Sequence, residues 1–96
     1  MAREPAVVRI VLRGEFDLSS EKQLATLLRP AEQADQAIID MAHLTYIDST
    51  GLGCLISLKK RLGAHGGVVQ LINVHPNVCK ILTICKLDQL FEISAA

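Results

Sequence analysis

Apolar and polar positions along the chain alternate between the period of a strand and the period of a helix. Residues 7–13 are mostly β-branched and apolar, with Arg9 and Arg13 at positions of the same parity. This pattern predicts a strand that covers one face and exposes the other. Gly14 is expected to end that strand, and residues 15–18 are expected to form a turn.

A helix is predicted to follow this turn. Ser20 and Gln23 have the spacing of a capping box. The buried stripe of the helix should comprise Leu24, Leu27, Leu28 and Ala31. Pro30 lacks the N–H that a regular helix needs, so we expect a kink or a stop near Arg29 and a short restart through Gln33.

The middle of the chain predicts a second strand and a second helix. Residues 37–41 form a short apolar run typical of a strand buried on both faces, and residues 42–45 should connect it to a turn at Asp48. A helix should begin at or just after Ser49 and end near Gly63. Its apolar side should comprise Leu52, Leu55, Ile56 and Leu62.

The C-terminal third repeats this alternation. Residues 68–74 read as a strand, and His75-Pro76 should start a helix, since proline is favoured at the first helical position. The inward side of that helix should comprise Val78, Ile81, Leu82 and Cys85, and residues 91–93 should add a short edge strand. Alternating strands and helices imply parallel pairing and right-handed crossovers. We therefore predict a small α/β domain, with a mixed, mostly parallel sheet of about four strands and helices packed against it.

Composition and charge narrow the classes of function. The 96 residues are expected to form one domain over residues 1–96, with an aliphatic core because half are hydrophobic and only three are aromatic. Ten basic and ten acidic residues cancel, which argues against a nucleic-acid partner. No signal-peptide pattern or membrane-spanning run occurs, so we expect a cytoplasmic protein without membrane insertion.

Cysteine and histidine spacing gives no sign of a metal site or a cofactor. The cysteines are Cys54, Cys79 and Cys85. They lack a CxxC spacing, so buried, reduced thiols are expected. The histidines are His43, His65 and His75, which are spread over three segments without a ligand pattern and are interpreted as loop or cap residues.

The candidate functional stretch is Asp48-Ser49-Thr50-Gly51-Leu52-Gly53, at the start of the second predicted helix. Asp and Ser accept hydrogen bonds from unpaired N–H groups in a first helical turn. Two glycines leave the backbone open to close approach. A hydroxyl at the positive end of a helix is also well placed to carry a phosphate. The alternative, that Ser49 and Thr50 only cap the helix, stays open on these residues alone.

This hexapeptide resembles the signature of STAS domains, especially of bacterial anti-sigma factor antagonists. The likeness extends along the chain in one collinear order. Residues 14–17 (Gly-Glu-Phe-Asp) are similar to the family's Gly-Glu-Leu-Asp turn, and residues 38–41 are similar to its apolar-Asp-apolar strand. Residues 78–91 resemble its last helix and closing turn, except that Lys86 stands where the family usually has glycine. That lysine would cost about 1 kcal/mol if its backbone must be left-handed.

The resemblance implies a phosphorylation site and a binding surface. Ser49 would be the phosphoacceptor, with Thr50 as the lesser candidate. Asp17 and Asp48 would flank the Ser49 hydroxyl, orient it, and repel a phosphate once present. The partner would contact Phe16, Leu18, Thr50, Gly51, Leu52 and Gly53.

The same resemblance implies the partners. A serine kinase that also acts as the anti-sigma factor would bind the unphosphorylated form, release its sigma factor, and supply ATP, while a phosphatase would reset the switch. The chain itself is expected to be a substrate and not an enzyme, because it lacks both the GxxxxGK[ST] and the GxGxxG loop.

Two other functions remain open. A STAS-like domain can be a regulatory subunit of a transporter or of a larger signalling complex, where phosphorylation plays no part. A small serine hydrolase is the second alternative. Residues 47–51 lack the first glycine of a nucleophile elbow, and no sequence feature assigns a histidine as base.

Overall fold

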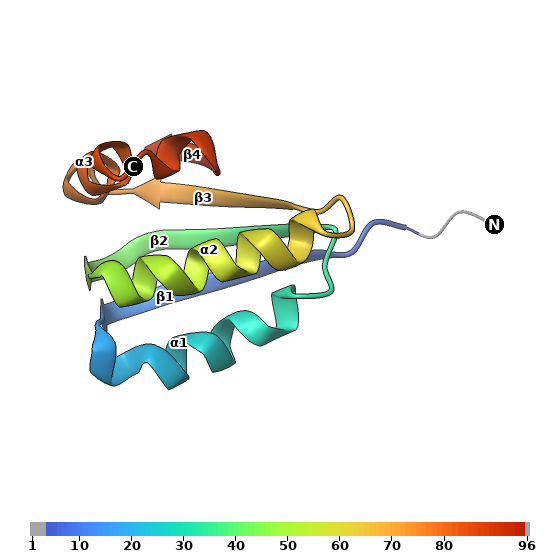
Figure 1. Ribbon diagram of the computed structural model, residues 1–96, viewed down its shortest axis with the longest axis horizontal. Coiled ribbons are helices and arrows are strands. Elements are labelled where there is room, and N and C mark those ends of the chain that lie inside the picture. The colour runs from blue at the N-terminus through green and yellow to red at the C-terminus, as the bar shows by residue number, and fades with distance from the viewer. Residues whose placement is uncertain (1–3, 96) are drawn as a thin grey trace.

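The protein is described by a computed structural model, in which residues 4–95 are placed (Figure 1). The expected absence of a leader at the N-terminus rests partly on residues 1–3, which lie outside that range, as does Ala96. In the described residues, four strands form one sheet in the order β1-β2-β3-β4, and each of the pairings is parallel. The strands are β1 (Val7–Phe16), β2 (Gln36–Ile47), β3 (Val68–Val74) and β4 (Glu92–Ala95). The α/β prediction is therefore confirmed, with a wholly parallel sheet in the described range.

Within residues 4–95, three α-helices and three short 3-10 helices connect the strands. The α-helices are α1 (Glu21–Leu28), α2 (Ser49–Gly63) and α3 (Pro76–Ile84). The 3-10 helices are η1 (Leu18–Ser20), η2 (Arg29–Ala31) and η3 (Leu87–Gln89). Helices α1 and α2 lie side by side on one face of the sheet (Figure 1). This arrangement follows from successive right-handed crossovers that proceed in one direction across the sheet.

The core lies between that face and the helices, and it is almost entirely aliphatic. Its most deeply buried members include Leu12, Leu24, Ile39, Leu55, Leu62 and Leu71. Two aromatic residues join this core, Phe16 at the end of β1, which is 2% exposed, and Phe91, which is 6% exposed. The core of Leu, Ile, Val and Ala that the composition predicts is confirmed.

Strands β1 and β2 are both longer than predicted. Gly14 does not end β1; it adopts a positive φ of 80° at the second of two register shifts, and pairing resumes at Glu15 opposite Tyr46. A bulge of this kind bends a strand without terminating it. Residues 42–45 accordingly belong to β2, so the prediction that they form a connection was wrong. His43 likewise lies in this strand and not in a loop.

The start of α1 differs from the predicted capping box. The Ser20 side chain makes no capping hydrogen bond to α1, and Asp17 instead caps η1. Leu27 is 38% exposed, so its place in the buried stripe was wrong, whereas Leu24, Leu28 and Ala31 are buried. The stop before Pro30 is confirmed, because α1 ends at Leu28 and the chain continues as η2.

Helices α2 and α3 begin where predicted but bury slightly different residues. In α2, Leu58 is buried while Ile56 is only half-buried. In α3, Val78 and Leu82 are buried, but Ile81 is 38% exposed and Cys85 is exposed. The expectation of inward positions for Ile81 and Cys85 was therefore wrong. Cys54 and Cys79 are partly buried, and all three cysteines are free thiols.

Asp40 joins three strands on the face of the sheet opposite α1 and α2. Its carboxylate accepts hydrogen bonds from the Ala42 N–H (3.0 Å), Asn73 Nδ2 (3.1 Å) and Arg9 Nη2 (2.9 Å). These donors, the Ala42 N–H above all, lower the pKa of Asp40 from 3.8 to about 2. The ionised carboxylate thus holds the middle of the sheet in register.

Candidate functional site

Ser49 lies where β2 passes into α2. Asp48 is the N-cap, with an extended backbone, and its Oδ1 accepts from the N–H groups of Thr50 (2.9 Å) and Gly51 (3.1 Å). Ser49 is therefore the first residue of the helix, and its side chain is exposed. The prediction that this serine follows the C-terminal end of a sheet strand is confirmed.

A second acidic turn follows β1. Asp17 caps η1, and its Oδ1 accepts from Ser19 Oγ (2.6 Å), the Ser19 N–H (2.9 Å) and Ser20 Oγ (3.3 Å). These hydrogen bonds, the one from the Ser19 hydroxyl above all, lower the pKa of Asp17. Asp17 therefore contributes a full negative charge to this edge at neutral pH.

The two acidic turns are held together by the backbone. The Asp48 N–H donates to the Phe16 carbonyl oxygen at 3.1 Å, immediately after the last residue pair of the β1–β2 ladder. Parallel strands end at the same edge of a sheet, so the Asp17 turn and Ser49 share that edge. The predicted proximity of residues 16–18 to residues 48–53 therefore agrees with the structure.

The structure does not support orientation of the serine by these carboxylates. Within residues 4–95 the Ser49 hydroxyl forms no hydrogen bond, and Asp17 and Asp48 are both engaged by other donors. Orientation of the hydroxyl by the two aspartates stays a prediction, since the other donors engage only the Oδ1 atom of each carboxylate. What they supply is helix capping and negative charge next to an unrestrained hydroxyl.

The predicted contact surface divides into exposed and buried residues. Leu18 is 72% exposed, Gly53 is exposed and Thr50 is half-buried. Phe16 and Leu52 are 2% and 5% exposed, and they belong to the hydrophobic core. Gly51 is buried as well.

Burial therefore contradicts the expectation that Phe16, Gly51 and Leu52 lie on the contact surface. Their apolar character reflects packing of the site against the sheet. Tyr46, 50% exposed near the end of β2, is a further large apolar side chain at this edge, and it was not among the predicted site residues. It was omitted because residues 42–45 were expected to lie outside the strand.

Among residues 4–95, no group of three or more His, Cys, Asp or Glu side chains could hold a metal ion. The rings of His65 and His75 each contact a backbone carbonyl oxygen, of Ala34 and Ala42 respectively. Within the same range, no helix is long and apolar enough to cross a membrane.

Comparison with known proteins identifies the family. The STAS domain model matches residues 1–96. A STAS-domain containing protein of Pseudomonas aeruginosa (strain UCBPP-PA14) is 34% identical over 86 residues, covering 88% of this chain and 85% of that protein. The anti-sigma-B factor antagonist of Bacillus subtilis (strain 168) is 32% identical over 89 residues, covering 92% and 82%.

A solved structure supports the same assignment of fold. The Bacillus cell fate determinant SpoIIAA in its phosphorylated form superposes with a TM-score of 0.71 at 23% identity, covering 97% of this chain and 86% of that one. The chain belongs to the STAS domain family, and its relatives include anti-sigma factor antagonists.

Proposed function

We propose that this protein is an anti-sigma factor antagonist whose binding is switched by phosphorylation of Ser49. Its 96 residues would form a single domain that acts in the cytoplasm. Unphosphorylated, it binds an anti-sigma factor that is also a serine kinase, and the sigma factor is released. The observation that carries this proposal is an exposed, unrestrained serine at the first position of α2, directly after the Asp48 cap.

The relatives supply independent support. The Bacillus subtilis protein at 32% identity is named an anti-sigma-B factor antagonist. SpoIIAA, which shares the fold, has been solved in a phosphorylated form. A modifiable serine and an anti-sigma factor partner are therefore reasonable expectations for this chain.

The capping geometry explains how a phosphate would weaken binding. Asp48 already occupies the N–H groups of Thr50 and Gly51, the donors that a phosphate on Ser49 would otherwise use. Phosphorylation adds about −1.5 to −2 charge at neutral pH. That charge would stand beside the carboxylates of Asp48 and Asp17 with few local donors, so burying it in an interface would be costly.

The size of this cost is sufficient for a switch. Leaving a buried charge unpaired costs about 3–5 kcal/mol. A loss of about 4 kcal/mol corresponds to roughly a thousandfold weaker binding. No refolding of the domain is required, because the charge acts directly at the contact surface.

The chain acts in this reaction as a substrate. The Ser49 oxygen attacks the γ-phosphorus of ATP held by the kinase, the bond to the β-phosphate oxygen breaks, and ADP leaves. The serine proton passes to a base of the kinase. A phosphatase would hydrolyse the resulting ester and restore the binding-competent form.

When the buried residues Phe16, Gly51 and Leu52 are left out, the proposed contact surface is small and lies near Ser49. Leu18 supplies exposed apolar area, Thr50 lies next to the phosphoacceptor, and Gly53 leaves backbone uncovered one turn along α2. A Cβ on Gly53 would meet nothing within 4 Å in the domain. We infer that a partner approaches the helix closely at this glycine.

The test measures affinity and phosphorylation with serine kinases of the anti-sigma factor class from the source organism. Ser49→Ala should bind like the unphosphorylated protein and accept no phosphate, whereas Ser49→Asp should bind far more weakly. Thr50→Ala should still be phosphorylated, and Ser94→Asp, on β4, serves as the charge control. Equal affinities of Ser49→Ala and Ser49→Asp would refute the switch. Binding without any phosphorylation would favour the regulatory-subunit alternative.

A further inference from the structure

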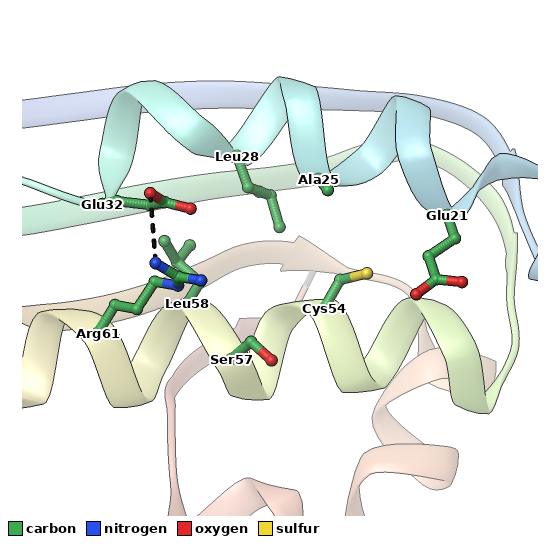
Figure 2. A pocket seen from close by; sticks show the side chains of 8 residues that line it. All are labelled: Glu21, Ala25, Leu28, Glu32, Cys54, Ser57, Leu58 and Arg61. Atoms are coloured by element: carbon green, nitrogen blue, oxygen red, sulfur yellow. Dashed lines mark ion pairs between the residues drawn. The ribbon is translucent and has the colours of Figure 1, made fainter.

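A groove separates α1 from α2 on the outer side of the helical layer (Figure 2). It encloses about 210 Å3. Leu28 and Ala25 of α1 line one wall, and Leu58 and Cys54 of α2 line the other. Ligand pockets for drug-sized molecules are usually about 300–1,000 Å3. The groove is therefore better suited to one side chain of another protein than to a cofactor.

The two ends of the groove carry different charge. At the end farther from Ser49, Glu32 Oε2 and Arg61 Nη1 form an ion pair at 3.7 Å, so those charges largely cancel. At the near end, the Glu21 carboxylate extends toward α2 (Figure 2). Within residues 4–95, Glu21 has no ion-pair partner. The groove therefore combines apolar side chains in its middle with a carboxylate at its near end that forms no ion pair within residues 4–95.

Cys54 belongs to the apolar part of the groove. Figure 2 shows its sulfur between the two helices. Burial, and then the negative charge of Glu21, raise the pKa of the Cys54 thiol. A neutral thiol is a weak nucleophile and behaves as a small apolar group. Its place here favours contact with an aliphatic side chain.

The groove adjoins the edge that carries Ser49. Glu21 follows η1 directly, and η1 is the helix that Asp17 caps. Cys54 lies five residues after Ser49, about 7.5 Å along the α2 axis. A partner that covers Ser49 and Leu18 would thus also reach the near end of the groove.

We propose that the groove between α1 and α2 is a second docking site for the same kinase, which inserts an aliphatic side chain followed by a lysine or arginine. The aliphatic group would lie against Ala25 and Cys54, above the floor that the buried Leu28 and Leu58 form, and the cation would pair with Glu21. This inference rests on the proposed function. It adds that the affinity for the kinase depends on the Glu21 charge and on the groove, neither of which is altered by phosphorylation of Ser49.

The first test is independent of any kinase and uses n-butylguanidinium as a cationic, aliphatic probe, with neutral n-butylurea as its control. In NMR titrations, the cation should shift the amides of Ala25, Cys54 and Leu58 saturably. Glu21→Gln should weaken its binding at least fivefold, and Glu92→Gln, on β4, should leave it unchanged. Equal binding of both probes, no effect of Glu21→Gln, or no saturable shifts would overturn the proposal.

NMR spectra recorded without probe over a range of protein concentrations test whether a second copy of this chain occupies the groove instead. If the same amides shift with protein concentration, a second copy of this chain occupies the groove and the proposal is wrong. Concentration-independent spectra are expected.

The second test uses the kinase that phosphorylates Ser49. Ala25→Leu fills the groove without changing charge, and Glu21→Gln removes the charge without filling it; each should weaken binding about tenfold. Wild-type affinity in both variants, together with weak binding by Ser49→Asp, would refute the groove and leave the proposed switch standing. Weak binding by the groove variants with no effect of Ser49→Asp would refute the switch instead.

Discussion

The backbone of Gly51 approaches Ile47 so closely that a Cβ added to the glycine would stand 2.5 Å from Ile47 Cγ1 and 3.0 Å from its Cδ1. Ile47 is the last residue of β2 and is 3% exposed. The first turn of α2 is therefore packed directly on the end of the strand. This close approach is what fixes the position of Ser49 at the edge of the sheet.

Gly51→Ala should destabilise the domain by about 1–3 kcal/mol, because the new methyl group overpacks a buried site. Gly53→Ala is the matched control two residues along the same helix, where a Cβ meets nothing within 4 Å. It should stabilise the domain by about 0.5–1 kcal/mol, since alanine is the better helix former. Urea denaturation measures both. Similar effects of the two substitutions would contradict this packing.

Gly53→Ala also separates folding from binding. Although the variant should be more stable, its affinity for the partner kinase should fall, because the added methyl group lies on the proposed contact surface. Isothermal titration calorimetry with the unphosphorylated protein would measure this. Undiminished affinity would place Gly53 outside the interface.

Lys86→Gly should raise the free energy of unfolding by about 1 kcal/mol. Lys86 has φ 60° and ψ 24°, a left-handed conformation that glycine adopts without cost. For a domain of this size the melting temperature should rise by about 4–8 °C. Lys86→Ala keeps the Cβ and should give no such gain, so equal stabilisation by alanine would show that backbone conformation is not the cause.

Asp40→Asn should destabilise the domain at neutral pH, by removing the charge that binds Arg9 and Asn73. The pKa of Asp40 is lowered from 3.8 to about 2 in the folded protein, so its contribution is complete above pH 3.8 and is lost as pH falls through 2. The stability difference between wild type and variant should therefore shrink across that interval. Asp88→Asn, exposed on η3, is the control. A pH-independent difference would contradict this assignment.

Local patterns were sufficient for much of the fold. The helical spacing after Ser49 and the proline at position 76 predicted the starts of α2 and α3, and the parity of Arg9 and Arg13 predicted the exposed face of β1. The left-handed backbone considered for Lys86 is confirmed. These features depend on a residue and its near neighbours, which the sequence contains.

The sequence was insufficient where the structure depends on contacts between segments that lie far apart in the chain. Pairing with β2 continues β1 through a bulge at Gly14, and hydrogen bonds from three segments converge on Asp40. Neither the bulge nor these hydrogen bonds can be predicted from the local spacing of apolar and polar residues. For the same reason the sequence identified Phe16 and Leu52 as site residues but could not tell that both face the core.

Phosphopeptide mass spectrometry of the native protein, purified from cells in growth and under stress, tests the central claim most directly. The switch predicts a phosphoryl group on Ser49 in a fraction of molecules that changes with the state of the cells. A Ser49 that is unmodified under every condition, or a phosphate found only on Thr50, would contradict it.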